Sequence, residues 1–512
     1  MNRGATFLLG IISSLGVNGI SIAINLVSIP IGLHYFGPVR YGIWLTLSSI
    51  IAYLNLSQLG IGTAIQTLIA KSVHPSHQRI ILRRSLFLLT IISFTSLALF
   101  VMVSYYYPGW VSILGKIPLS HKSETSETAL ILAVLLLIGQ PTKAFLSTFV
   151  ALQEKHWERF YFALTTIFGL VALVITIYIK GGLLTLAMLR GLSNMTFGIL
   201  SGFHLLYVHP DIRLWHGLRE RVLGAPSVLF ILKSSAYFFT SSIAAIIIWN
   251  TDNIVISHFL GPSMVTTYAI TFKLFLVGTT FFTLVNNVLL PIYARAAGMK
   301  QFEWIQKTYI SSIDISMIIG GLIWVGGLAF AQDIINVWVG PTVNGSVLLI
   351  IALGGYCYSL CICNTHFIIL SSINAMKNVV IISWFEAATN IGISIALIGH
   401  LGISGVALGT FFAPLISSFW LLPIDIAFQT KGKVRFKYRQ ITSHMVLVLF
   451  PALVVVYILN IKGPYGWSGI CIKAVVIIIY LGCSWCIIPR DQRRFIRNKI
   501  REHLIRNKTN SF

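Results

Sequence analysis

Five charged side chains lie deep inside long apolar segments of this sequence: Lys143, Arg190, Asp252, Lys273 and Glu386. A charge in hydrocarbon costs several kcal/mol on most scales, so each is expected to face a cavity or an oppositely charged partner. Lysine and arginine at such depth can bind a phosphate group, because the attraction is strong in a low-dielectric cavity. The two acids can serve as counter-charges or as sites for a coupling ion.

Lys143 follows the dipeptide Gln140-Pro141. A proline inside a helix removes a backbone hydrogen bond and favours a kink, so the ammonium is expected beside a bend near the middle of the membrane. There it binds substrate or forms a structural pair with Glu386. Arg190 is expected roughly 10 Å below the outer surface, at 1.5 Å per residue. It either reaches the interface or receives an emerging phosphate.

Asp252 and Lys273 flank one predicted corner, nine residues before Gly261 and eleven after Pro262. Both therefore lie roughly 14–17 Å below that corner, on adjacent antiparallel helices. They form either a buried ion pair that fixes the two helices, or an anion site at Lys273 with Asp252 as its counter-charge or coupling-ion site. The two readings are compatible in different states of one cycle.

The other polar residues in apolar segments carry weaker indications. Asn55 and Gln58 lie on neighbouring faces of one predicted helix, where amides commonly hold helices together, so packing is favoured over a role as polar cavity lining. Lys233, Lys473 and Asp314 are expected near helix ends, within reach of water. The histidines show no metal-ligand grouping, so no metal, cofactor or catalytic residue is predicted.

The elements that must position these residues are transmembrane helices. The 512 residues are 56% hydrophobic and only 10% charged, with a mean hydropathy of +0.84, which is typical of a chain whose solvent is the bilayer. Apolar runs long enough to cross about 30 Å of hydrocarbon recur along the whole sequence. We predict an all-α protein of about fourteen transmembrane helices: 8–33, 42–70, 85–107, 129–152, 161–179, 183–207, 229–257, 264–290, 309–331, 347–370, 379–398, 402–424, 442–461 and 468–488.

Most of the net charge of +23 lies in segments that are predicted to be cytosolic. With the N-terminus inside, the cytosolic segments hold 27 Lys and Arg and 8 acids, which is +19 of the total. This positive-inside asymmetry predicts cytosolic termini and some attraction to anionic lipid headgroups. It removes the reason to expect nucleic acid as a partner.

Two corners repeat at an offset of 224 positions. The stretch His34–Trp44 aligns with His258–Tyr268, and both contain Gly-Pro. Six predicted helices separate the corners, which indicates two parallel six-helix repeats about an axis along the membrane normal, with a substrate path between them. The predicted organisation is a six-helix bundle over 1–224, a second over 225–428, and two further helices with a basic cytosolic tail over 429–512.

Little of the chain is expected outside the membrane. The longest outer segment, 108–128, has about twenty residues, and the outer acids that could serve catalysis are Glu124, Glu127 and Asp333. An enzyme that polymerises or ligates glycans would be expected to present a sizeable acidic outer loop. Transport is therefore favoured over catalysis.

The corner motifs also resemble a known family. The stretches FGPVRYGIW (36–44), Gln58-Leu-Gly60 and TDNIVISHFLGP (251–262), with Tyr268 and Lys273, look like the polysaccharide transporter family, the Wzx-type flippases of the multidrug/oligosaccharidyl-lipid/polysaccharide exporter superfamily. Family members often carry an acid where this chain has Gln58 and a base where it has Asn253.

The resemblance implies a V-shaped pair of bundles in the bacterial inner membrane. It also implies that the chain moves undecaprenyl-pyrophosphate-linked oligosaccharide, such as an O-antigen repeat unit of lipopolysaccharide, to the outer leaflet. Other polysaccharide-assembly membrane proteins would be partners. Lys143, Lys273 and Arg190 would bind the pyrophosphate. The alternatives are a multidrug or cation exporter of the same fold and a membrane-embedded glycan polymerase or ligase.

Overall fold

The computed structural model describes residues 3–72, 74–107, 109–111, 115–214, 226–462, 467–487 and 493. The predicted basic tail beyond residue 487 therefore lies, apart from Arg493, outside the described residues. The chain divides into two compact units, Met1–Thr266 and Thr267–Phe512. The predicted division of the sequence repeat at 224/225 stays a prediction.

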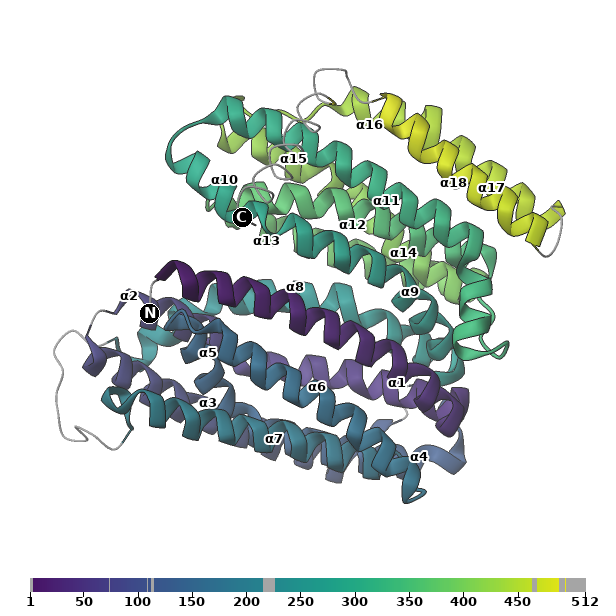
Figure 1. Ribbon diagram of the computed structural model, residues 1–512. Helices are drawn as coiled ribbons and strands as arrows, with labels where there is room; N and C mark the ends of the chain where they lie inside the picture. Colours follow the sequence, from purple (N-terminus) through teal and green to yellow (C-terminus); the bar gives the residue numbers. More distant parts are fainter. Residues whose placement is uncertain are drawn as a thin grey trace, which may run out of the picture. The chain divides into compact units, whose positions relative to one another are not determined.

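The described residues form helices and no strand (Figure 1). Helices up to the division are α1 (Arg3–Leu54), α2 (Ile61–Lys71), α3 (Pro75–Tyr106), α4 (Leu119–Gly139), α5 (Lys143–Ala151), α6 (Lys155–Tyr178), α7 (Leu183–Val208) and α8 (Val228–Leu260), with short 3-10 turns η1 (Asn55–Gln58), η3 (Gln140–Thr142) and η4 (Pro210–Ile212). Those that follow are α9 (Pro262–Asn286), α10 (Leu289–Gly298), α11 (Phe302–Val339), α12 (Val347–Ser372), α13 (Met376–Leu401), α14 (Ile403–Ile416), α15 (Ser418–Gln429), α16 (Tyr438–His444), the π-helical turn η5 (Met445–Leu449), α17 (Phe450–Lys462) and α18 (Trp467–Ile487).

Thirteen helical segments of the described residues are long and apolar enough to cross a membrane. The predicted all-helical membrane fold is confirmed. The predicted helices 8–33 and 42–70 are counted together, because α1 runs through a kink at Gly37. Helix α4 begins at Leu119, ten residues before the predicted 129, because hydropathy marks only the apolar part of a helix.

The two corners share one backbone conformation. Gly37 has φ 70° and ψ 170°, and Gly261 has φ 96° and ψ 165°. Glycine enters this region without a steric penalty. The following prolines, Pro38 and Pro262, suit the start of the next helix because their missing N–H needs no partner there. The 224-residue repeat in sequence is thus also a repeat in local geometry.

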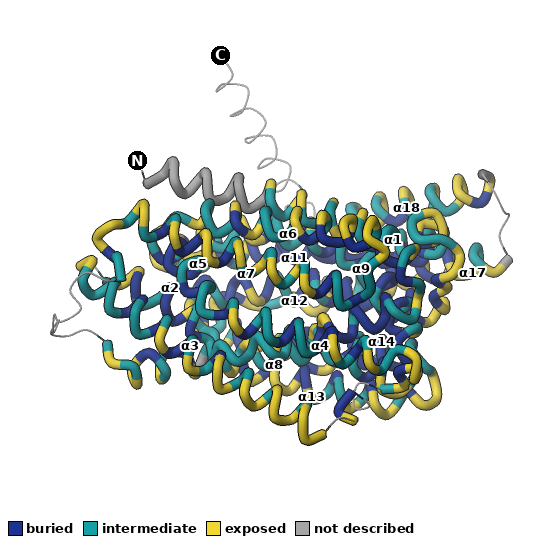
Figure 2. The backbone as a smooth tube through the Cα atoms, turned by 90° about the horizontal axis from the view of Figure 1, so that it is seen from below, coloured by how far each residue is buried: buried dark blue, intermediate teal, exposed yellow. Residues whose placement is uncertain are grey.

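The two units have different interiors. In the first unit, branched and aromatic side chains of α2, α3 and α5, among them Ile65, Leu82 and Phe149, form a buried core. In the second unit most residues of α12 are buried. Many residues of α18 are instead intermediate or exposed (Figure 2), and the exposed residues of α17 and α18 include many apolar ones. Apolar exposure of this kind is expected where lipid is the solvent.

The last helices pack on α11 through bonds to its carbonyl groups. Asn460 donates to the carbonyl of Leu328 at 2.7 Å, and Lys473 donates to that of Ala329 at 3.0 Å. The buried Tyr480 hydroxyl donates to Met317 at 3.2 Å. These bonds attach 450–487 firmly to the second unit.

Candidate functional site: a cationic cavity in the first unit

Two interrupted helices form the floor of the site. After α4, Pro141 lies in the 3-10 turn η3, and a new helix, α5, begins at Lys143. The chain changes from α-helix to a 3-10 turn at this proline, which cannot donate the helical hydrogen bond; the predicted kink itself stays a prediction. After α1, the chain forms η1 and then turns through Leu59 and Gly60, with φ of 50° and 72°, before α2 begins.

A buried amide joins the two interruptions. Gln140 is completely buried. Its side-chain oxygen accepts hydrogen bonds from the hydroxyls of Ser57 and Ser93, each at 3.0 Å. Polar side chains in apolar surroundings are costly unless they are bonded in this way. The network therefore links the two helix interruptions. Asn55 belongs to one of them and Lys143 directly follows the other.

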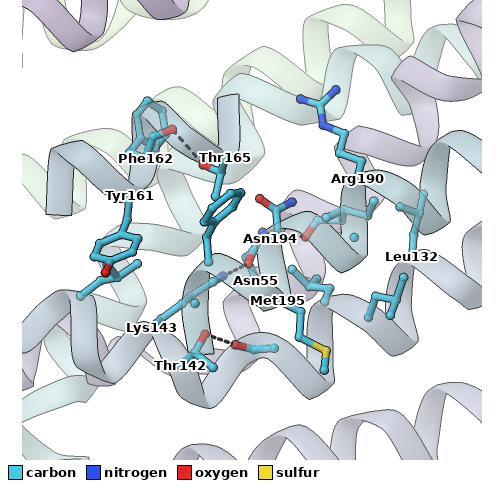
Figure 3. Close-up of a pocket in the computed structure, with 18 of the residues that line it drawn as sticks. Asn55, Leu132, Thr142, Lys143, Tyr161, Phe162, Thr165, Arg190, Asn194 and Met195 are labelled. Atoms are coloured by element: carbon cyan, nitrogen blue, oxygen red, sulfur yellow. Dashed lines mark hydrogen bonds between the residues drawn. The ribbon is translucent and has the colours of Figure 1, made fainter. Parts of the chain in front are cut away.

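Lys143 points from its break towards the other one. Its ammonium donates a hydrogen bond of 2.5 Å to the side-chain oxygen of Asn55, as Figure 3 shows. Gln58 donates a longer bond, 3.4 Å, to the same oxygen. Asn55 therefore lies between the cation and a second amide, and Gln58 supports Asn55 from outside the cavity lining.

Lys143 and Asn55 line a cavity of about 460 Å³. Its lining comes from α1, η1, α4, η3, α5, α6 and α7, and it contains Asn55, Lys143 and Arg190. Three residues that sequence reasoning placed on separate segments thus border one space. Figure 3 shows Arg190 and Lys143 at different ends of it, with Asn194 between them.

The two cations differ in depth. The ends of α5 and α7 lie on the same side, because His209, just after α7, is 3.0 Å from Glu154, just after α5. Lys143 lies eight residues from the end of α5 and Arg190 eighteen from the end of α7, so they are staggered by roughly 15 Å at 1.5 Å per residue. An anion moving along the cavity would meet one cation after the other.

Aromatic and amide groups surround the cations. The Arg190 guanidinium lies 5.9 Å from the ring centre of Trp44, a distance suited to a cation–π contact. Asn194 follows Arg190 by one helical turn and faces the same space. Among the described lining residues, the only carboxylate is Glu158, which is 3.2 Å from Arg159. The described lining is therefore net cationic, and most of its other side chains are apolar.

An apolar groove borders the cavity. It has a volume of about 820 Å³, lies between α6 and α7, and shares Tyr161 and Phe197 with the cavity lining. Most of its other side chains are aromatic or aliphatic, including Phe160, Phe203 and Tyr207. A charged compartment and an apolar one thus meet at two shared residues, an arrangement that suits an amphiphilic ligand.

The remaining predicted site residues lie elsewhere. Asp252 is buried in α8 of the first unit, and Lys273 is half-buried in α9 of the second. The predicted pairing of these two stays a prediction, as does that of Lys143 with Glu386. Glu386 is buried in α13 and accepts hydrogen bonds from Ser417 and Ser418, where α14 gives way to α15.

Three features of the site and its surroundings were missed or misplaced by sequence reasoning. The break at Asn55–Gly60 falls inside the predicted helix 42–70. Asn194 was overlooked, although its spacing of four residues from Arg190 could have indicated it. The prediction that Asp314 reaches water at a helix end is wrong, because α11 begins at Phe302 and Asp314 is completely buried.

The three acids that were predicted to lie in outer segments make contacts within the protein. Glu124 accepts hydrogen bonds from Arg40 and from the backbone N–H of Leu183. Glu127 accepts a 2.8 Å bond from Ser123. Asp333 lies 3.9 Å from the ammonium of Lys473. A pair of acids positioned to act on one substrate is not apparent among these three.

Comparison with known proteins identifies relatives of the chain. A protein named "Putative O-antigen transporter" from Salmonella typhimurium is 25% identical over 416 residues, covering 78% of this chain and 92% of the relative. "Putative O-antigen export protein" of Yersinia pseudotuberculosis is 24% identical, covering 83% and 96%. No family model matches. The resemblance noted in the sequence is confirmed.

Solved structures show the same fold. The lipid II flippase MurJ in an inward closed conformation has a TM-score of 0.69 at 16% identity, covering 94% of this chain and 99% of that one. An inward-facing multidrug resistance MATE family transporter of the MOP superfamily has a TM-score of 0.65 at 18% identity, covering 82% and 99%. The chain is thus a multi-pass membrane protein with a MurJ- and MATE-like helical fold.

Proposed function

We propose that this protein is a flippase that moves a lipid-linked oligosaccharide across the bacterial inner membrane. The observation that carries the proposal is the shared cavity of Lys143 and Arg190, bordered by an apolar groove. The named activities of the Salmonella and Yersinia relatives support it. The function proposed is transport, because the cavity offers cations and amides that can bind a phosphate group and the relatives are named as transporters.

The substrate proposed is undecaprenyl-pyrophosphate-linked oligosaccharide. A pyrophosphate needs cations or oriented donors in a low-dielectric space, and Lys143, Arg190, Asn55 and Asn194 supply them. The groove between α6 and α7 suits part of the polyprenyl chain, so the chain need not enter the charged space. The sugar would use the amides and the aromatic faces of the cavity. Lys273 of the second unit is proposed as a further phosphate-binding cation.

Movement along the cavity follows from the stagger of the cations. A phosphate held at Lys143 would pass to Arg190 roughly 15 Å further along the helices. Neither cation must then release the anion into an uncharged apolar space, which would be costly. Asp252 and Glu386 are proposed as counter-charges or coupling-ion sites that reset the cycle.

Translocation by purified protein in proteoliposomes tests this proposal. Lys143→Ala and Arg190→Ala should each lower the amount of lipid-linked sugar reaching the opposite leaflet by tenfold or more, since each removes a charge-assisted contact of about 1.5–3 kcal/mol. Lys273→Ala should also lower it. Lys155→Ala removes an exposed cation at the start of α6 and should leave translocation intact. Full translocation by Lys143→Ala and Arg190→Ala, both present in the membrane, would refute the cation site.

A multidrug or cation exporter is the alternative of the same fold. A cationic drug would be repelled by Lys143 and Arg190, and the cavity offers it one carboxylate, Glu158, already beside Arg159. We therefore expect no uptake of a cationic dye by the same proteoliposomes under conditions where lipid-linked sugar moves. Dye transport without sugar transport would favour the exporter.

A further inference from the structure

The chain that follows α15 and continues into the first residues of α16 alternates basic and smaller or apolar residues without a break. It reads Lys-Gly-Lys-Val-Arg-Phe-Lys-Tyr-Arg from Lys431 to Arg439, and we call it the basic strap. All five cations are exposed, whereas Val434 is completely buried and Phe436 is half-buried. The strap turns at Lys431 and Gly432 and runs into α16 at Tyr438. The difference in exposure therefore separates five outward-facing cations from the inward-facing Val434 and Phe436.

Several contacts fix the strap to the second unit. Gln306 of α11 donates to the carbonyl of Arg435 at 2.8 Å and accepts from its backbone N–H at 2.5 Å. The N–H of Val434 donates to the hydroxyl of Thr430 at 3.2 Å. Phe436 packs edge-on against the ring of the buried His366, with ring centres 5.0 Å apart. The cations thus project from an anchored segment rather than from a loose loop.

The positive charges of the strap are not neutralised by carboxylates of the described residues. Within the described part of the chain, none of its five cations forms an ion pair with an Asp or Glu. Lys433 lies over the ring of Phe302, 4.9 Å from its centre, and Arg435 donates to the carbonyl of Gly432 at 3.0 Å; both contacts leave the positive charge uncompensated. Like charges so close together repel one another unless an anion is bound.

The position of the strap indicates which kind of anion would bind it. It connects two membrane-crossing segments, which end at Gln429 and begin at Ile441. Tyr438 of the strap stacks on Trp420 of α15, with ring centres 5.6 Å apart, and both are partly exposed, as aromatic residues are at membrane interfaces. The five exposed cations are distributed along the strap from Lys431 to Arg439, so they can meet several separate headgroup phosphates.

We propose that the basic strap is a binding surface for the headgroups of anionic phospholipids. The exposed cations attract headgroup phosphates, while Val434 and Phe436 hold the strap against the second unit. The partly exposed rings of Trp420 and Tyr438 suit the interface that the headgroups form. Binding would stabilise the end of the second unit where α11, α15 and α16 meet. The proposal does not depend on the substrate in the cavity of the first unit.

Lipid binding by the purified full-length chain in neutral detergent tests the proposal, since membrane orientation then plays no part. Phosphatidylglycerol and phosphatidylcholine with the same acyl chains are added separately. Lipid retention is measured by native mass spectrometry, and thermal stability is measured in parallel. The wild type should retain phosphatidylglycerol preferentially and gain stability from it, less so at high salt because salt screens exposed charges. Inorganic phosphate at the same concentration should give no such gain.

The variant K431Q/K433Q/R435Q/K437Q/R439Q should bind phosphatidylglycerol at least about tenfold more weakly, as expected when several interfacial cations are lost. The control K71Q/K155Q/R295Q/K300Q/K377Q removes five other exposed cations and should keep the preference. K431R/K433R/K437R should also keep it, because the charge remains. An undiminished preference in the strap variant, or an equal loss in the control, would overturn the proposal and leave topology or a soluble acidic partner as the role of the strap.

Discussion

The ammonium of Lys143 donates a 2.5 Å hydrogen bond to the side-chain oxygen of Asn55, and this bond connects the two broken helices of the first unit. Broken helices at membrane depth occur in transporters where substrate or ion sites are built, because free backbone and side-chain groups can then face a cavity. Here the interruption between α4 and α5 is followed by the cation, Lys143, and the interruption after α1 contains its neutral partner, Asn55. A neutral partner leaves the charge of Lys143 available to an anion.

Asn55→Ala should therefore weaken transport by moving Lys143 rather than by removing it. A hydrogen bond to a charged group is worth about 1.5–3 kcal/mol, so we expect roughly a tenfold fall in translocation, smaller than the fall in Lys143→Ala. Asn25→Ala, which removes an exposed amide bonded to Ser21, is the matched control. Translocation in Asn55→Ala equal to that of the wild type would show that the bond does not position the cation.

The sequence predicted one of these breaks and not the other, for a physical reason. Proline removes a backbone donor wherever it lies, so Pro141 predicts a break without knowledge of the surroundings. The break after Leu54 has no proline. It depends on Gly60, whose φ is 72° and where an added Cβ would lie 2.6 Å from the carbonyl oxygen of Ser235. That approach of α8 is a tertiary contact, which local sequence does not reveal.

The same distinction holds for the candidate site. Cations within apolar segments could be found from the sequence alone, which is how Lys143 and Arg190 were selected. The spacing of four residues from Arg190 indicates that Asn194 shares its helix face, but that this face borders a cavity depended on how α6 and α7 pack. The depth of Asp314 likewise depended on the true start of α11, which lies before the apolar run begins.

The two Gly-Pro corners contact each other in a reciprocal way that gives a second prediction. The hydroxyl of Thr266 donates to the carbonyl of Pro38 at 2.7 Å, and a Cβ added at Gly42 would lie 1.8 Å from the carbonyl oxygen of Pro262. Positions 42 and 266, like 38 and 262, are 224 apart. Gly42→Ala should thus separate the corners and lower thermal stability strongly.

Two further variants serve as comparisons for Gly42→Ala. Thr266→Val should cost only about 1 kcal/mol, the net worth of one hydrogen bond. Gly19→Ala adds a methyl group where nothing lies within 4 Å and should be neutral or slightly stabilising. The measurement is the unfolding temperature of purified protein in detergent. Equal unfolding temperatures for Gly42→Ala and Gly19→Ala would contradict the close contact of the corners.

Substitutions of Glu386 can separate the effect of its charge from the effect of its packing. Its carboxylate accepts hydrogen bonds from Ser417 and Ser418 in a buried site. Glu386→Gln keeps the shape and an accepting oxygen but removes the charge, so stability should change by less than about 1 kcal/mol. If Glu386 is a counter-charge or coupling-ion site, the same variant should lose most of its translocation. Retained translocation in Glu386→Gln, with loss only in Glu386→Ala, would assign Glu386 a purely structural role.

The contact between Glu154 and His209 predicts a dependence of stability on pH. It lies outside the membrane-crossing segments, with Oε2 and Nε2 3.0 Å apart. The pKa of Glu154 is lowered, chiefly because His209 donates a hydrogen bond to it. A lowered folded-state pKa gives stability that is present above the unfolded pKa, about 4.3 for Glu, and is lost as pH falls through the folded value.

Comparing the wild type with Glu154→Gln between pH 3 and 7 measures this contribution. The wild type should be the more stable above about pH 4.3, and the difference in unfolding temperature should shrink below it, because only the wild type has a carboxylate there to protonate. Glu303→Gln, which removes an exposed acid at the start of α11, should show a smaller pH-dependent difference. A difference between Glu154→Gln and the wild type that stays constant down to pH 3 would mean that the Glu154–His209 contact contributes through packing and not through charge.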